Sequence, residues 1–544
     1  MDPIKKVFDR RHFVLAGGAV SAVSALAVAG HAEKTSKSDA TTGCGANSNQ
    51  GIIHGVMVQK PVHKPVKMLT LEEVMAVAGA GAQGGPGAAG GPSGPGGAPG
   101  GASGGPGDAA KSNGEEGPGD FRDVKATPAV SIVDGKYVIE GSKPENVKSG
   151  KVSEKLATDL KIAASTSANG GVYVKGAGSE YSLVNANIDL SGSAPLSLGG
   201  PNSGAGADDY ATLVIRNSTI TTNGRWRNAT SVQNHSILKV YNSTLTAHGE
   251  PFTPDITKTA QKQQLEIDGN SRAHVTLSNS YSYFYYSTIV GDGWAALSTD
   301  GSEGFVYLEA NNCKVQTIKS GYGTYADGQC HNVINRCDFD VASMATIIAG
   351  EADVTFNDTL AKCGSYFALI HAIGSPNEMG TLKVTGGEVK CKNAGVLIKS
   401  ANAEIVFDGT KIVSQSNVLL KSATSVDPQA AKAAKTKGMQ VYGIHATLKN
   451  MDVEGDVIHT TDKENRGMTV YLESTTLKGA IKDASIKMNR LSKWIATADS
   501  NITIIGDVDV SQIDAPAGVT ITAMASVSGK YKLASCGTLI LLAS

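Results

Sequence analysis

The sequence predicts an all-β protein whose main body is a single right-handed parallel β-helix, a solenoid of stacked coils. Short strands of alternating apolar residues recur along the chain with a minimum spacing of about 22 to 24 residues, which is typical of repeat architectures. Aromatic residues make up only 5% of the chain and glycines number 64, a composition that suits many short stacked turns. We expect a signal peptide over 1–32, a disordered Gly/Pro-rich spacer over 33–124 and the β-helix over 125–544.

The N-terminus has the pattern of an export signal. Lys5, Lys6, Arg10 and Arg11 precede an uncharged stretch over 13–30, which is the order of a secretory signal peptide. The run 9–14, Asp-Arg-Arg-His-Phe-Val, resembles a twin-arginine (Tat) signal. The alternatives are a Sec signal with two arginines, or an uncleaved anchor, because the apolar run is just short of a membrane span. We expect the Tat translocase as a partner, no transmembrane helix in the mature chain, and a periplasmic, cell-surface or extracellular location.

The region before the body has the composition of a spacer. Residues 79–119 contain almost no large apolar side chains, so burial cannot offset the entropy of ordering them. Glycine does not recur strictly at every third place, which argues against a collagen triple helix. The sequence therefore predicts a disordered spacer here.

The repeats share one template, in which an alternating strand is followed by a polar or small residue and a second strand. Residues 213–220 and 238–245 are two examples, and each has Asn at its fifth place. Parallel strands in neighbouring coils pair in register, so equivalent residues stack into ladders. Because Asn satisfies backbone groups at bends, we expect a structural ladder on one edge of Asn217, Asn242, Asn279, Asn312 and Asn450, with Arg336 at the equivalent place.

Leucine-rich repeats are the nearest alternative architecture, but they need helical segments that this chain lacks. Segments 381–389, 404–412 and 446–453 resemble secreted right-handed β-helix proteins with a pectate-lyase-like fold, and the resemblance covers about residues 130–543. It extends to architecture alone. The chain has no paired Asp-Asp with Gly-His-Gly, no Asp-Pro-His-Glu and no Trp-Ile-Asp-His, so these families lend no catalytic assignments.

A second strand in each coil ends at a position that is often ionisable. After two apolar residues, and with one extra residue before Asp292, successive coils carry Asp292, Asp327, Ala349, His371, Lys399 and Lys421. In register these form a column at heights about 4.8 Å apart. Aromatic residues are concentrated around it, and aromatic faces with convergent polar groups suit sugar rings. The sequence predicts a groove with catalytic residues Asp292, Asp327, His371, Lys399 and Tyr325, and substrate-binding residues Trp294, Tyr322, Tyr285, Glu351, Arg225 and Arg227.

This column indicates a protein that binds or processes carbohydrate, with an acidic polysaccharide as one option. A uronate lyase or epimerase needs a base, for which His371 or Lys399 stand, and a proton donor such as Tyr325. A glycoside hydrolase needs two carboxylic acids, for which Asp292 and Asp327 stand. Oxygen ligands for Ca²⁺ would be Asp292, Asp327 and Glu351. The alternatives are a non-enzymatic surface, structural or adhesin-like module, or a companion of another Tat-exported protein.

Charge and cysteine content add two further limits. A net charge of -1 and a pI near 6.8 give no bias towards nucleic acid, which we exclude as a partner. Cys313 and Cys337, and likewise Cys363 and Cys391, fall in neighbouring coils and so within disulfide reach. The sequence leaves open whether these cysteines are bonded or are buried thiols.

Overall fold

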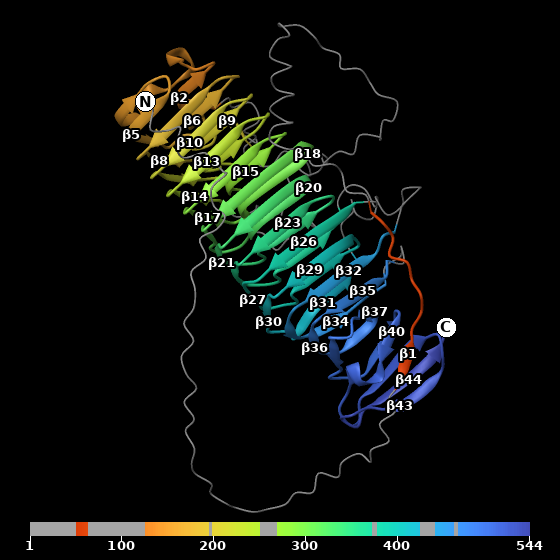
Figure 1. Cartoon of the computed structure of the whole chain (residues 1–544). Helices are drawn as coiled ribbons and strands as arrows, with labels where there is room; N and C mark the ends of the chain where they lie inside the picture. The colour runs from red at the N-terminus through yellow and green to blue at the C-terminus, as the bar shows by residue number, and fades with distance from the viewer. Residues whose placement is uncertain are drawn as a thin grey trace, which may run out of the picture. The chain divides into compact units, whose positions relative to one another are not determined.

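The structure is a computed structural model that describes residues 51–63, 126–194, 199–250, 269–372, 378–424, 441–461 and 466–544. The expected signal peptide and most of the expected spacer lie outside these residues. In the described body, nearly all strands are parallel and stack as consecutive coils (Figure 1). The predicted parallel β-helix is therefore confirmed. Among the described residues, no helix is long and apolar enough to cross a membrane.

The strands pair along three ladders, and each coil contributes to ladder A, then to ladder B, then to ladder C, as β22, β23 and β24 do. Ladder A is formed by β2 (Thr127–Val133), β6 (Asn169–Lys175), β9 (Ala205–Asp208), β12 (Thr230–Val232), β15 (Arg272–Leu277), the first parts of β18 (Ala295–Asn311) and β20 (Tyr322–Asn335), β22 (Thr346–Ala349), β25 (Ala368–His371), β28 (Val396–Lys399), β31 (Val418–Ala423) and β34 (Asp456–Ile458).

Ladder B is formed by β7 (Glu180–Val184), β10 (Thr212–Arg216), β13 (Ile237–Tyr241), β16 (Tyr281–Tyr285), the second parts of β18 and β20, β23 (Asp353–Asn357), β26 (Met379–Thr385), β29 (Asn402–Asp408), β32 (Ile444–Lys449), β35 (Met468–Glu473), β37 (Ile481–Met488), β39 (Ser500–Ile504), β42 (Thr520–Ala525) and β44 (Thr538–Ala543).

Ladder C is formed by β5 (Leu156–Ala164), β8 (Asn187–Ser191), β11 (Thr219–Asn223), β14 (Thr244–His248), β17 (Thr288–Asp292), β19 (Lys314–Thr317), β21 (Asp338–Val341), β24 (Leu360–Cys363), β27 (Glu388–Cys391) and β30 (Lys411–Ser414), followed by β33 (Asp452–Glu454), β36 (Thr476–Lys478), β38 (Lys493–Ile495) and β41 (Ile513–Asp514).

Antiparallel pairs and short 3-10 turns lie at the two ends of the stack. At the first coils, β3 (Lys136–Tyr137) pairs with β2 and β4 (Val147–Val152) pairs with β5, near the turns η2 (Ile139–Gly141) and η3 (Pro144–Asn146). At the last coils, β43 (Gly529–Lys532) pairs with β44, and β1 (Ile52–His54) pairs with β40 (Asp507–Asp509), which leads into η5 (Val510–Gln512).

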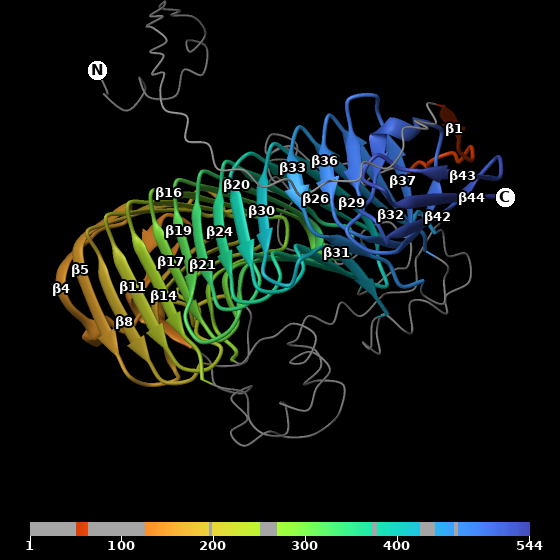
Figure 2. The ribbon, with the colours of Figure 1, turned by 90° about the horizontal axis from the view of Figure 1, so that it is seen from below.

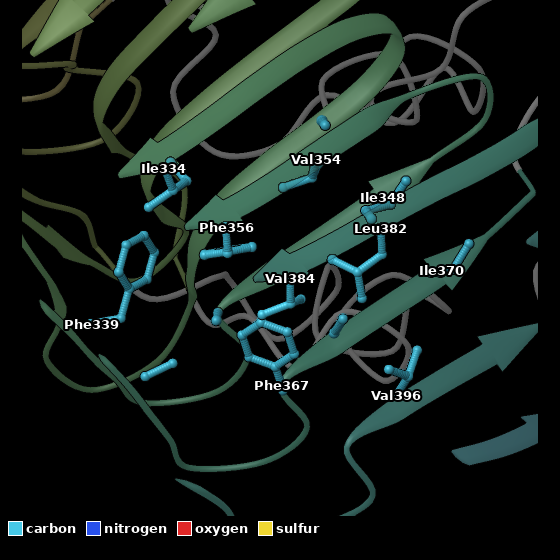
Figure 3. Close-up of a cluster of buried hydrophobic side chains, with 14 of the residues drawn as sticks. Ile334, Phe339, Ile348, Val354, Phe356, Phe367, Ile370, Leu382, Val384 and Val396 are labelled. Carbon is cyan, nitrogen blue, oxygen red and sulfur yellow. The ribbon is translucent and has the colours of Figure 1, made fainter. Parts of the chain in front are cut away.

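The core lies between the three ladders, because alternate side chains of every strand point inwards. Ile348 and Ile370 of ladder A meet Phe356 and Val384 of ladder B and Phe339 of ladder C, all of them buried (Figure 3). The ring centres of Phe339 and Phe356 are 5.6 Å apart. Each such buried side chain stabilises the fold by roughly 1.5–3 kcal/mol.

The corner between ladders B and C carries the predicted Asn ladder. Asn217, Asn242, Asn312 and Asn450 stand there with φ between 47° and 53°, the left-handed region that Asn tolerates. The expectation for Asn279 was wrong. Asn279 follows β15 at the corner between ladders A and B, and Tyr286, with φ 52°, stands at its expected place. The strand of β15 has the same alternation as the ladder B strands, so local pattern alone did not separate them.

The residues that directly follow this corner, one in each coil, form a second ladder inside the helix. The Ser243 hydroxyl accepts the Ser218 N–H at 3.0 Å, and the Cys337 thiol accepts the Cys313 N–H at 3.3 Å. The predicted neighbours Cys363 and Cys391 also pair in register. All four of these cysteines are buried free thiols. Directly after the corner, the thiols of Cys313 and Cys337 thus take the place that serine and threonine hydroxyls take in other coils, whereas Cys363 and Cys391 end β24 and β27 in ladder C.

Candidate functional site

The register of ladder A brings a set of ionisable residues into one row. Asp300 pairs with Asp327, and the pairing continues through Ala349 and His371 to Lys399. We call these five residues the ladder A row. The prediction placed Asp327, His371 and Lys399 in one column, and the structure brings them together.

Two members of the predicted column lie elsewhere. Asp292 ends β17 in ladder C, where it pairs with His248, and its Oδ2 is 3.1 Å from Lys319 Nζ. Lys421 pairs with Leu397, two places before Lys399. Both expectations were wrong. Counting residues from coil to coil did not allow for the long strand β18, which contains Asp300, or for the change of register between β28 and β31, which displaces Lys421. Asp300, which the sequence reasoning missed, takes the place that was given to Asp292.

The row points away from the main core. Ala326, Ile348 and Ile370 belong to that core, and each comes directly before a row residue in its strand. Successive side chains of a strand point to opposite faces, so the row lies on the outer face of ladder A. It is nevertheless covered, because Asp327 and His371 are only 4% and 3% exposed. The predicted groove is therefore not open to solvent at these residues.

A second apolar cluster lies beside the row on the same face. Tyr325, Ile347, Leu369 and Leu397 pair in register within it, two places before the row residues. The predicted site residues Trp294 and Tyr322 also belong to this cluster, and the Trp294 indole N–H donates to the Tyr322 hydroxyl. These aromatic rings give the row an apolar border.

The first end of the row is a buried group of opposite charges. Burial raises the pKa of Asp327 well above its ordinary range, and the charge of Asp300 adds to that shift. The Tyr325 hydroxyl donates to Asp327 Oδ2 at 3.2 Å. Arg272 lies over the Trp294 ring at 3.8 Å, and its Nε has no hydrogen-bond partner. Asp327 is thus held in a protonated state to higher pH than an ordinary aspartate.

His371 is the least satisfied side chain of the row. Neither ring nitrogen has a hydrogen-bond partner among the residues that the structure describes, although the side chain is buried. Burial lowers the pKa of His371 to about 3, and the charge of Lys399 acts in the same direction. Ala349 separates His371 from Asp327, so the two stand two strand spacings apart, about 10 Å. His371, whose pKa is lowered by burial, and Asp327, whose pKa is raised by burial, therefore flank a position with a very small side chain.

Glu351 lies at the corner that follows Ala349 and borders the row. Its Oε1 is 2.6 Å from His63 Nε2, and its Oε2 accepts the Met379 N–H at 3.1 Å. Glu378, which the sequence did not indicate, lies beside Gly350: a Cβ built at Gly350 would be 3.1 Å from its Oε2. Both oxygens of Glu351 are thus held by partners within this chain.

Tyr285 lies away from the row. It belongs to ladder B, where its ring stacks on Tyr241 with centres 5.0 Å apart and planes at 10°. The Arg216 guanidinium stands 4.2 Å from the centre of the Tyr241 ring. The stacked faces are used within the protein, so this arrangement stabilises neighbouring coils rather than offering a ring to a sugar.

The two predicted arginines are also in other surroundings. Arg227 was expected to bind substrate, but it is completely buried and donates to five backbone carbonyl groups. Arg225 donates through Nε to Glu250 Oε2 at 2.7 Å. The sequence gave no sign of this burial, because the carbonyl groups around Arg227 come from three segments distant in sequence.

No metal centre is evident in the part of the chain that the structure describes, since no three His, Cys, Asp or Glu side chains there are placed to hold an ion. The expected Ca²⁺ ligands Asp327 and Glu351 remain near each other along ladder A, whereas Asp292 stands in ladder C. One signal would have found Asp300: the sequence Thr-Asp-Gly at 299–301 aligns with Ala-Asp-Gly at 326–328.

Comparison with protein-family models, with curated proteins and with solved structures finds no match to this chain.

Proposed function

We propose that this protein is an exported β-helix protein that binds or processes carbohydrate, including acidic polysaccharide, at the ladder A row. The observation that carries the proposal is His371, a buried side chain with two unpaired ring nitrogens, in register with two carboxyl groups. A buried polar group without a partner costs roughly 1–3 kcal/mol. A bound ligand that forms hydrogen bonds with the two ring nitrogens of His371 would remove this cost.

The border of the row supports a sugar as that ligand. Sugar rings bind against aromatic side chains with a few fixed polar groups around them, and Trp294, Tyr322 and Tyr325 provide the aromatic side chains. Arg272 and Lys399 place positive charge towards the two ends of the row. Positive charge at both ends favours a ligand that carries carboxylates.

Two reaction classes use these groups. Elimination or epimerisation of a uronate needs a base and a proton donor, which a neutral His371 and a protonated Asp327 or Tyr325 supply. Hydrolysis needs two carboxyl groups, one as an acid and one as a base or nucleophile, for which the stacked neighbours Asp300 and Asp327 stand. We propose an enzyme of one of these two classes, a polysaccharide lyase or epimerase, or a glycoside hydrolase.

The test is an array of neutral and acidic polysaccharides, read for binding, for reducing ends and for the ultraviolet absorbance of unsaturated uronates. Asp327→Asn and His371→Gln change the chemistry at nearly constant size, and we expect each to lower binding or turnover at least tenfold. Lys421→Ala is the matched control, because Lys421 is an exposed residue of the same ladder outside the row. Parental binding and turnover in both row variants would exclude the row as the site.

A non-enzymatic surface or structural module is the second candidate function. The observation in its favour is the cover over the row, since a substrate cannot reach side chains that are 3–4% exposed without some movement. A module of this kind would retain partner binding in the Asp327→Asn and His371→Gln variants, which separates it from the first candidate.

Export by the twin-arginine route is the remaining part of the proposal. Replacing Arg10 and Arg11 by lysine should leave the precursor in the cytoplasm, folded and unprocessed. The measurement is the distribution of the protein between cell fractions. Normal export of that variant would indicate the Sec route instead.

A further inference from the structure

A segment from the expected spacer range is part of the folded body. We call residues 51–63 the strap. Its first part, β1, pairs antiparallel with β40 at the last coils, and Ile53 is completely buried in the main core. Ser526 Oγ donates to the His54 carbonyl at 2.6 Å. The strap is therefore firmly anchored at the C-terminal end of the helix, where Figure 2 shows β1 beside β43 and β44.

From this anchor the strap runs back along the coils to the corner between ladders A and B (Figure 1). Lys60 Nζ lies 2.6 Å from Glu404 Oε2 and 5.7 Å from the centre of the Tyr471 ring. His63 Nε2 lies 2.6 Å from Glu351 Oε1, and its ring meets the Tyr442 ring edge-on at 4.8 Å. Two basic strap residues thus face two carboxylates, Glu351 at this corner and Glu404 within β29 of ladder B.

The far end of the strap lies next to the row. Glu351, which His63 contacts, is two residues beyond Ala349 of the row, and its other oxygen holds the Met379 N–H. The Gly350 N–H donates to the carbonyl of His371 at 3.2 Å. The charge of Glu378 also acts on Asp327, raising the pKa of that carboxyl further. The corner that His63 contacts is therefore hydrogen-bonded, through Gly350, to the backbone of His371.

We propose that the strap is a latch on the ladder A row: Lys60 and His63 hold the corner closed, and their release, with β1 still anchored, gives solvent and ligand access to His371. The identity of the ligand rests on the proposed function, but the latch itself does not. Glu351, expected from the sequence to bind substrate, is occupied by His63 in the closed state. Release of His63 frees one of its oxygens.

The strap has a strong end and a weak end. The anchor combines strand pairing with a buried isoleucine, and such segments open only with large parts of the fold. The far end depends on two side-chain ion pairs and on no strand pairing among the described residues: Lys60 is 44% exposed, and His63 and Glu351 are 15% and 16% exposed. An exposed ion pair such as that of Lys60 contributes little to stability. The far end therefore opens first, without loss of the anchor.

The test uses diethyl pyrocarbonate, which modifies accessible neutral histidines, on the full chain, with each histidine read by peptide mass spectrometry. His54, whose side chain is 61% exposed, serves as the reference for full reactivity. His274, buried in the main core, serves as the reference for unfolding. In the parent protein we expect labelling of His54 and protection of both His274 and His371.

The double variant Lys60→Ala/His63→Ala should label His371 at least tenfold faster than the parent does, with His274 still protected. Glu351→Gln, which keeps the size of the side chain, should have the same effect in weaker form. Asp507→Asn at the anchor is the matched control, because it removes an ion pair of the strap far from the row. That variant should leave His371 protected.

Two results would overturn the latch. One is unchanged protection of His371 in the double variant while amide exchange shows that residues 59–63 are released. The other is joint labelling of His274 and His371, which would mean that the strap supports the whole fold rather than guarding the row. Confirmed labelling without any glycan binding would leave the latch in place and remove the carbohydrate proposal alone.

Discussion

His274 and His371 are two buried histidines on opposite faces of ladder A, and they differ in one respect. Burial lowers the pKa of each to about 3. His274 Nδ1 lies 2.9 Å from Thr230 Oγ1, and its Nε2 lies 2.8 Å from Ser282 Oγ, inside the main core. His371, on the outer face, has no partner at either nitrogen. The two histidines are therefore equally buried but differ in hydrogen bonding. His274 is a structural residue, and His371 is a candidate ligand contact.

The largest expected effect is on the pH dependence of stability. Both folded pKa values lie below the unfolded value of about 6.5, so between pH 6.5 and about 3 the unfolded chain binds more protons. The contribution of these two histidines to stability is then full above pH 6.5 and falls as the pH drops, by about 1.4 kcal/mol per pH unit for each histidine. Denaturant titrations across this range measure it. His371→Leu should remove one of the two contributions, and an unchanged slope would show that His371 is not buried in solution.

The next effect concerns the paired histidine. His274→Leu leaves Thr230 and Ser282 without their ring partner inside the core, so we expect a loss of about 2–3 kcal/mol in the free energy of unfolding at pH 7.5. Urea unfolding at that pH, where both histidines are neutral, measures the loss. A variant as stable as the parent would mean that the hydrogen bonds of His274 do not contribute to the free energy of unfolding.

The unpaired histidine should respond in the opposite direction. His371→Leu replaces a buried polar ring without partners by an apolar side chain, and we expect a gain of about 1 kcal/mol at pH 7.5. The same variant should lose glycan binding. Greater stability together with lost function is the expected signature of a functional residue. A destabilised variant would instead place His371 with His274 as a structural residue.

The smallest effect is expected at an exposed histidine. His54 pairs with Asp507 at 3.0 Å, but the two side chains are 61% and 69% exposed. Exposed ion pairs contribute little, so the thermal midpoint of His54→Ala should remain within experimental error of that of the parent. A clear loss would show that the strap anchor depends on this pair as well as on β1 and Ile53.

Local pattern predicted much of the fold correctly. The positions of Asn217, Asn242 and Asn312 follow from strand alternation and the preference of Asn for positive φ, and both are properties of short segments. Asp327, His371 and Lys399 were placed together for the same reason, since the coils between them are short and regular. Within such coils, counting residues is equivalent to measuring height along the helix.

Counting failed wherever the coils changed length. Asn279 and Asp292 come from longer coils, in which the same alternating pattern occurs in strands of different ladders. Pattern identifies a strand and its inward face, but only pairing assigns the strand to a ladder. That is why Asp292 was predicted at the place that Asp300 occupies.

The sequence by itself determined the parallel coils, the Asn corner, the stacked cysteines and the central members of the row, because each follows from a period of two along a strand and from a regular coil length. Only the tertiary structure decided that the row is covered, that Arg227 is buried among carbonyl groups, and that residues 51–63 close on the last coil and on Glu351. These features depend on contacts between residues that are far apart in the sequence, from 25 to 61 positions for Arg227 and 288 positions for His63 and Glu351. No local period encodes such contacts.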